Sequence, residues 1–177
     1  VYTDPPGNLD INQGAPPDFT VTDLNDYLNE KERITASIPL SKGCAWGKCT
    51  FCSSYASQYS QLHKEKALEH LLTIHGQTGI SNFMFSDEAS PLEVLDHIAA
   101  GLISRNISIS WIFHTRLTSR LSRERCSLYR QAGCRQICVG VESTSDRILK
   151  KMQKGISFKQ IDEFFNYPDR GISIIAY

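Results

Sequence analysis

Residues 34–52 read Ile-Thr-Ala-Ser-Ile-Pro-Leu-Ser-Lys-Gly-Cys-Ala-Trp-Gly-Lys-Cys-Thr-Phe-Cys, and this stretch decides how the rest of the sequence is interpreted. Its first part, 34–40, is rich in apolar and β-branched side chains, which predicts a strand. Lys42-Gly43 interrupts that pattern, and Cys44, Cys49 and Cys52 follow within nine residues. The sequence therefore predicts a loop with three cysteines directly after a strand.

The remainder of the sequence alternates short apolar runs with amphipathic helical patterns. Strands are predicted at 34–40, 82–85, 107–114, 136–141 and 172–177, and helices at 68–75, 91–102, 122–132, 146–152 and 157–167. Ser157 and Gln160 have the spacing of a capping box at the start of the last helix. This alternation predicts right-handed βαβ units, and hence an α/β fold with a parallel sheet and helices outside it.

Polar residues follow the predicted strands, and parallel sheets gather their ligands at the carboxyl ends of strands. The cysteines follow the first strand, Ser86-Asp87-Glu88 the second, His114 to Arg116 the third and Gly140 to Ser143 the fourth. We therefore expect these four groups to meet on one rim of the sheet.

The number of clustered cysteines bears on the kind of metal site. Structural zinc takes four ligands, and the nearest further candidate after the three thiols is a lone His63. Three thiolates on a 4Fe-4S cluster instead leave one iron open to a substrate. The pattern favours iron–sulfur over zinc, and Cys126, Cys134 and Cys138 have positions typical of core residues.

Composition narrows the class of protein. The 177 residues are 41% hydrophobic, enough for one domain with an ordinary core, and 19 basic residues balance 19 acidic ones, so charge does not support nucleic-acid binding. Neither a membrane span nor a secretion signal is apparent, which predicts a cytoplasmic protein without a disulfide framework.

Residues 1–33, with Pro5, Pro6, Pro16 and Pro17, are interpreted as a linker or extended lead-in segment. Because the sequence starts at Val1 and stops at Tyr177 inside an apolar run, we expect it to be part of a longer chain.

The cysteine stretch resembles the radical SAM superfamily, whose members commonly carry C-x3-C-x2-C with an aromatic residue before the third cysteine. Phe51 is at that aromatic position, and the first gap here has four residues instead of three. Residues 41–52 are similar to a branch that often follows a cobalamin-binding domain. That branch also has a Pro-Asp-Phe and a Leu-x-x-Tyr, which Pro17-Asp18-Phe19 and Leu24 to Tyr27 match.

The resemblance implies a partial β/α barrel in which residues 34–177 form the radical SAM core, with five of about six core strands present and the core cut short at its C-terminus. It implies that Cys44, Cys49 and Cys52 hold a 4Fe-4S cluster that cleaves S-adenosylmethionine to a 5'-deoxyadenosyl radical. It places cofactor contacts at Phe51, Asp87, Glu88, Arg116, Glu142 and Ser143. Asp87 and Glu88 would accept from the methionine amine, Arg116 would pair with its carboxylate, and Glu142 would accept from the ribose hydroxyls.

By the same resemblance, the parent protein could use cobalamin for methyl transfer through an upstream cobalamin-binding domain. It would need a reductant such as flavodoxin or ferredoxin and a substrate that the sequence does not identify.

Several alternatives stay open at this point. Asp87 and Glu88 could cap the following helix, Glu142 could be a solvated strand end, and Arg116 a surface charge. The whole chain could be a non-catalytic zinc- or iron–sulfur-binding module.

Overall fold

The computed structural model describes residues 10–21, 23–26, 34–53, 58–166 and 171–177. Five strands form one sheet, in the order β1 (Thr35–Ile38), β4 (Asn82–Phe85), β5 (Ser110–Arg116), β6 (Cys134–Gly140) and β7 (Ser173–Ala176). Every neighbouring pair is parallel, and the order in space follows the order in sequence. This confirms the predicted α/β fold with five parallel strands of a partial barrel. Among the described residues β1 and β7 are edge strands, so the sheet is not closed.

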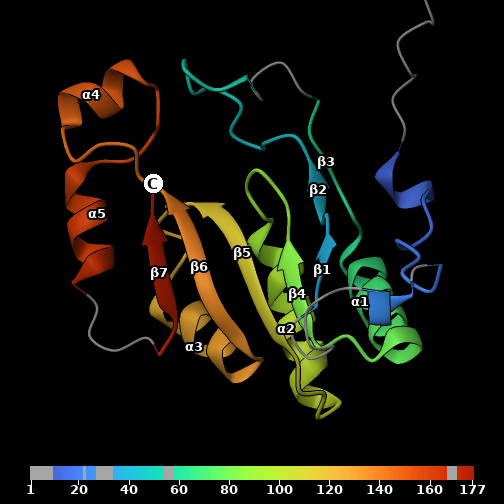
Figure 1. The fold of residues 1–177 in the computed structure, drawn as a ribbon. Helices are drawn as coiled ribbons and strands as arrows, with labels where there is room; N and C mark the ends of the chain where they lie inside the picture. The colour runs from blue at the N-terminus through green and yellow to red at the C-terminus, as the bar shows by residue number, and fades with distance from the viewer. Residues whose placement is uncertain (1–9, 22, 27–33, 54–57, 167–170) are drawn as a thin grey trace, which may run out of the picture.

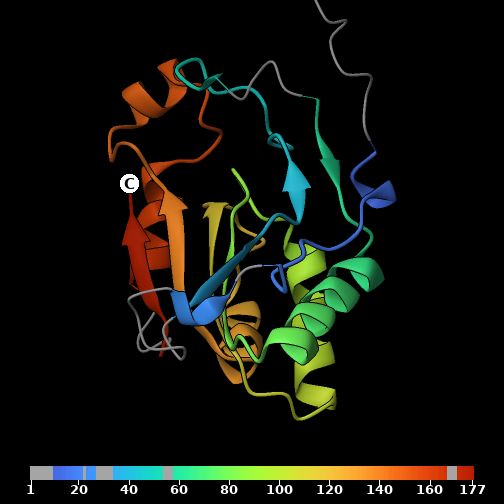
Figure 2. The ribbon, with the colours of Figure 1, turned by 45° about the vertical axis from the view of Figure 1, so that its right-hand side comes forward.

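Helices cover one face of the sheet and connect its strands. These are α1 (Lys64–Thr78), α2 (Leu92–Ser104), α3 (Arg123–Gln131), α4 (Asp146–Lys151) and α5 (Phe158–Phe165). α1 packs on α2 and α2 on α3 (Figure 2), whereas α4 and α5 both lie between β6 and β7 in the chain. The predicted capping box is present, since Ser157 and Gln160 bond reciprocally at the start of α5. Within the described ranges, no helix has the length and apolarity that crossing a membrane requires.

Strand alternation separates the two faces of the sheet. The buried set on the helix-covered face includes Phe83, Phe85, Trp111, Phe113, Ile137 and Val139. The Trp111 ring contacts those of Phe85, Phe113 and Tyr129 at centroid distances of 5.6, 5.7 and 5.5 Å. The Trp111 Nε1–H donates to the Ala132 carbonyl at 2.8 Å, so the largest core side chain buries no unpaired donor. Side chains at 112, 114 and 136 point to the other face and are only partly covered.

A small two-stranded ribbon lies outside the main sheet and was not expected from the sequence. β2 (Ser41–Lys42) pairs antiparallel with β3 (Ser60–Gln61). Two residues per strand are too few for the alternation that reveals a strand in a sequence. The ribbon joins the two ends of the segment that carries the cysteines.

Part of the lead-in segment packs on the domain. It contains two short 3-10 helices, η1 (Ile11–Gln13) and η2 (Leu24–Asp26), and the partly buried Ile11, Phe19 and Leu24 contact the core. The Asn12 side chain donates to the Gln61 carbonyl at 3.1 Å. The boundary at residue 33 remains a prediction, and Pro5 and Pro6 lie outside the described residues.

Four of the five strands differ in their bounds from the predicted ones: β1 and β7 are shorter than predicted, and β5 and β6 are displaced along the sequence. The strand predicted at 107–114 runs from Ser110 to Arg116, and the one predicted at 136–141 runs from Cys134 to Gly140. The Ile107 N–H donates to the Leu102 carbonyl at 3.0 Å, which ties this apolar residue to the end of α2 instead of to the sheet. Apolar character alone therefore placed the strand three residues too early.

Gly133, between α3 and β6, lies so close to the backbone of Ile109 that an amino acid with a side chain does not fit at this position. Its φ is +93°, and a Cβ there would lie 1.9 Å from the Ile109 carbonyl oxygen. Gly133→Ala should therefore lower the free energy of unfolding by more than about 1 kcal/mol, measured by urea denaturation. The control is Gly76→Ala in α1, where a Cβ meets nothing within 4 Å and a gain of about 0.5–1 kcal/mol is expected. Equal stability of the two variants would contradict this interpretation.

Candidate functional site

The carboxyl ends of the parallel strands all lie at the same end of the sheet, which we call the rim (Figure 1). Residues 43–53, the cysteine loop, follow β2 at the rim. Register places Arg116 at the end of β5 beside Gly140 at the end of β6. The sequence-predicted rim is thus present as an arrangement of strand ends.

The three cysteines of this loop differ from the other three in burial. Cys44, Cys49 and Cys52 are half-buried free thiols, whereas Cys126, Cys134 and Cys138 are buried. Burial raises the pKa of the Cys49 thiol, and the charges of Lys154 and Arg116 oppose that shift. These two cations therefore offset part of the effect of burial, and the pKa of Cys49 stays above its ordinary value.

Glycines shape the cysteine loop. Gly47, inside the four-residue gap between Cys44 and Cys49, has φ +55°, in the left-handed region that glycine adopts without strain. The Cys52 N–H donates to the Cys49 carbonyl at 3.2 Å, which closes the second gap as a turn.

Across the described part of the chain, no three His, Cys, Asp or Glu side chains are grouped around a position for a single metal ion.

The cysteine loop docks on residues 152–155, the latch segment, which follows α4. The Trp46 Nε1–H donates to the Gln153 carbonyl at 2.9 Å, and the Thr50 N–H donates to the Met152 carbonyl at 3.0 Å. The Trp46 ring lies against Gly155, where an added Cβ would be 2.3 Å from the ring at Cζ2. Two segments about a hundred residues apart in sequence are thus fastened together, and no local sequence signal indicates the contact.

Arg116 completes this contact from the sheet side. Its guanidinium lies 4.2 Å from the Trp46 ring centroid, and its Nη2 donates to the Lys154 carbonyl. Its Nε is buried and has no hydrogen-bond partner in the described ranges. Desolvation lowers the pKa of Arg116, and the nearby Cys44 and Cys49 oppose the shift. Arg116 therefore brings an unused donor to a place beside the cysteines.

Arg116 also lines a cavity of about 280 Å³, the rim cavity, between the cysteine loop, the start of α2 and the residues after β5. Cys44 and Trp46 form part of its wall, and so does Thr118, whose buried Oγ1 has no partner among the described residues. A cavity lined by Arg116, Thr118 and a thiol is suited to a polar ligand, and the positive charge of Arg116 favours an anionic group. Thr118 was not identified from the sequence.

Asp87 and Glu88 have different environments although they are adjacent. Asp87 is 2% exposed, and its Oδ1 accepts from the Leu40 N–H, the Ser41 N–H and the Ser41 hydroxyl at 2.8, 2.6 and 2.9 Å. Its Oδ2 accepts from the Ser90 hydroxyl at 2.8 Å. Burial raises the pKa of Asp87, and these hydrogen bonds oppose the shift. Asp87 thus fastens the end of β1 to the end of β4, whereas Glu88 is exposed.

Neither residue caps α2, because Pro91 is the N-cap and no side chain bonds there.

Glu142, after β6, is paired with Lys154 of the latch segment. Lys154 Nζ lies 2.9 Å from Glu142 Oε1, and the exposed fractions of the two side chains are 6% and 27%. The same ammonium lies 5.6 Å from the ring centroid of Phe51, which is 52% exposed. Ser143 is half-buried, and its hydroxyl accepts from the Ser145 N–H at 3.1 Å. The structure thus brings Phe51, Arg116 and Glu142 around the latch segment.

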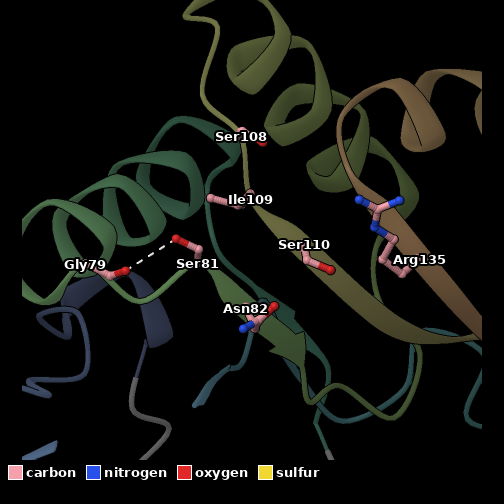
Figure 3. Close-up of a pocket in the computed structure, with 7 residues that line it drawn as sticks. All are labelled: Gly79, Ser81, Asn82, Ser108, Ile109, Ser110 and Arg135. Carbon is pink, nitrogen blue, oxygen red and sulfur yellow. Dashed lines mark hydrogen bonds between the residues drawn. The ribbon is translucent and has the colours of Figure 1, made fainter. Parts of the chain in front are cut away.

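A different cavity, of about 390 Å³, lies at the opposite end of the sheet (Figure 3). Ser81, Asn82, Ser108 and Ser110 line it, and Arg135 reaches it from β6. It contains no thiol and lies at the amino ends of the strands, away from the cysteine loop. The rim cavity is therefore the better candidate for the functional site.

The fold and the site define an α/β protein of the partial-barrel class with a three-cysteine loop on its carboxyl rim, and comparison with known proteins identifies the family. Residues 38–173 match the Radical SAM superfamily, and the chain belongs to it. Enzymes of this superfamily use a 4Fe-4S cluster and S-adenosylmethionine.

Relatives of known sequence or structure agree with this assignment. The chain is 29% identical over 126 residues to an uncharacterised methyltransferase of Pyrococcus horikoshii, an alignment that covers 68% of this chain and 27% of that protein. The cobalamin-dependent S-adenosylmethionine radical enzyme OxsB shares the fold with a TM-score of 0.63 and 22% identity over 79% of this chain and 23% of that one. The radical S-adenosylmethionine methyltransferase TsrM from Kitasatospora setae has a TM-score of 0.67 and 18% identity over 82% and 30%. The chain spans less than a third of each of these proteins.

The contacts of Asp87 predict that it stabilises the fold. Asp87→Ala leaves two backbone N–H groups and two hydroxyls without their acceptor, so the free energy of unfolding should fall by more than about 2 kcal/mol in urea denaturation. The neighbouring Glu88→Ala serves as control and should leave stability within about 0.5 kcal/mol. If Asp87 served only as a cofactor ligand, its substitution would leave the stability of the cofactor-free protein unchanged.

Proposed function

We propose that this chain binds a 4Fe-4S cluster through Cys44, Cys49 and Cys52 and reductively cleaves S-adenosylmethionine to a 5'-deoxyadenosyl radical. The observation that carries the proposal is the position of these half-buried thiols, on a rim loop that is held against the latch segment beside the buried Lys154 and the half-buried Arg116. When bound, the cluster supplies a low-potential electron and an open iron position.

The residues around the thiols fit such a group. Three thiolates add three negative charges, and the nearby cations of Lys154 and Arg116 lower the cost of placing them together. Because all three ligands come from one short loop, a single backbone conformation positions them. Docking of that loop through Trp46 and Thr50 restricts its conformations before any ligand binds.

Different rim side chains are suited to different groups of S-adenosylmethionine. The Arg116 guanidinium, which lines the rim cavity, is suited to the methionine carboxylate. Glu142 is suited to the ribose hydroxyls, Ser143 follows it in sequence, and the Phe51 ring lies near the Lys154 ammonium that pairs with Glu142. For the methionine amine, we propose the loop after β4, where Asp87 holds the backbone and the exposed Glu88 offers a carboxylate.

The parent protein's reaction is proposed to be a cobalamin-dependent methyl transfer. The similarity to a protein named a methyltransferase and the shared fold with two enzymes described as cobalamin-dependent or methyltransferase support it. An upstream cobalamin-binding domain, a reductant such as flavodoxin or ferredoxin and a small or macromolecular substrate would complete the system. A cytoplasmic location is part of the proposal, because ligand cysteines must remain reduced.

The test is anoxic reconstitution of the chain with iron and sulfide, reduction with dithionite, and measurement of 5'-deoxyadenosine with S-adenosylmethionine as the only added substrate. About four iron and four sulfide per chain, with 5'-deoxyadenosine formed, is the expected result. One zinc per chain would instead favour the non-catalytic zinc module. A full cluster without any cleavage of S-adenosylmethionine would favour an iron–sulfur module.

Cysteine substitutions test the ligand assignment. Ala at Cys44, Cys49 or Cys52 should abolish iron binding, measured by iron content and absorbance, because three thiolates are the full protein ligand set. Ala at Cys126 or Cys138 is the matched control and should leave the iron content unchanged while costing packing stability. Equal iron loss in both groups would overturn the assignment.

A further inference from the structure

Lys154 is a buried cation whose burial needs an explanation. It lies in the latch segment, immediately before Gly155, and its side chain is 6% exposed. A buried ammonium is costly unless it is paired and hydrogen-bonded. Its acceptor is Glu142 Oε1 at 2.9 Å, so the pair joins the latch segment to the end of β6.

The backbone holds both partners of this pair in place. The Lys154 N–H donates to the Leu149 carbonyl at 3.0 Å, and its carbonyl accepts from Arg116. Glu142 has φ +66°, a conformation uncommon for a residue with a side chain. Its N–H donates to the Tyr177 carbonyl at 2.6 Å, which stabilises this conformation. Hydrogen bonds therefore fix the backbone positions from which the Lys154 and Glu142 side chains extend.

Gly140 provides the space in which the two charges meet. A Cβ at Gly140 would lie 2.9 Å from Lys154 Nζ and 3.0 Å from Glu142 Oε1. Its φ is not in the left-handed region, so the absence of a side chain, and not backbone freedom, explains the glycine. Gly140, Glu142 and Lys154 thus form one unit.

We infer that Lys154 is a positioning residue that holds the Glu142 carboxylate in the orientation that accepts the ribose hydroxyls of S-adenosylmethionine. Pairing through Oε1 leaves Oε2 of Glu142 without a hydrogen bond inside the described ranges, and the Glu142 side chain is 27% exposed. One oxygen is therefore fixed by the protein while the other is available to a ligand. This inference depends on the proposed function.

A different role for the same cation is direct contact with the methionine carboxylate of the cofactor. The two roles predict different ligand dependence. A residue that positions Glu142 affects ligands with a ribose, whereas a residue that contacts the carboxylate also affects free methionine. Substitution combined with two ligands can therefore separate them.

The experiment compares Lys154→Met with Lys151→Met in the cluster-reconstituted chain. Lys151 is an exposed lysine three positions earlier, at the end of α4, and receives the same substitution. Dissociation constants are measured by spectroscopic titration of the cluster with S-adenosylmethionine and, separately, with methionine. We expect Lys154→Met to weaken S-adenosylmethionine binding at least about tenfold while methionine binding and iron content stay unchanged. Lys151→Met should match the wild type for both ligands.

Three more variants show whether Lys154 acts through Glu142: Glu142→Gln, its combination with Lys154→Met, and Gly140→Ala. If it does, Glu142→Gln combined with Lys154→Met weakens S-adenosylmethionine binding no more than Glu142→Gln alone. Gly140→Ala keeps both charges but displaces them, so it should reproduce the loss for S-adenosylmethionine and leave methionine binding intact. Unfolding midpoints of all variants control for damage to the fold.

The inference is overturned if the two substitutions are additive, if methionine binding falls in parallel, or if Lys154→Met binds S-adenosylmethionine as the wild type does. If the wild-type chain assembles its cluster but does not bind S-adenosylmethionine, the proposed function fails, and the inference fails with it. These results are distinguishable, because only the last concerns the wild type.

Discussion

The fastening of the cysteine loop to the latch segment is the interaction on which the rest of the site depends. A loop with three thiols has no core of its own, and its position is fixed by Trp46, which donates to Gln153 and packs on Gly155. Arg116 stacks on the same ring and donates to Lys154, so one indole joins the loop, the latch segment and β5. Removing the indole would free the loop that carries the thiols and would remove the ring on which Arg116 stacks.

Charge is balanced locally at this site as well as over the whole chain. The formal net charge is zero, yet Arg116 and Lys154 are both largely removed from water at the rim. Desolvation lowers the pKa of Arg116, and the nearby Cys44 and Cys49 oppose that shift, while Lys154 is paired with the Glu142 carboxylate. A cluster held by three thiolates would add negative charge where buried positive charge already lies, so the rim is electrostatically prepared for an anionic occupant.

The sequence predicts those features that depend on local patterns, and it misses those that depend on contacts between distant segments. Alternating strand and helix patterns gave the five parallel strands, and the spacing of Ser157 and Gln160 gave a capping box that the structure contains. The role of Asp87 in joining β1 to β4 and the pairing of Lys154 with Glu142 were not predicted. Both involve a polar side chain whose partner is decided by the tertiary fold, and composition around the residue does not reveal it.

Asp87 and Glu142 show why a carboxylate after a strand does not by itself define a binding site. Both follow strands of the same sheet, and the sequence offers the same reason to assign each to the cofactor. Burial separates them: among the described residues Asp87 accepts four hydrogen bonds from the protein's own N–H and hydroxyl groups, whereas Glu142 keeps one oxygen without such a partner. A saturated carboxylate stabilises the loop that carries the thiols, and a half-satisfied one can exchange water for a ligand. The number of lone pairs left free after folding, and not the residue type, distinguishes a structural acid from a binding one.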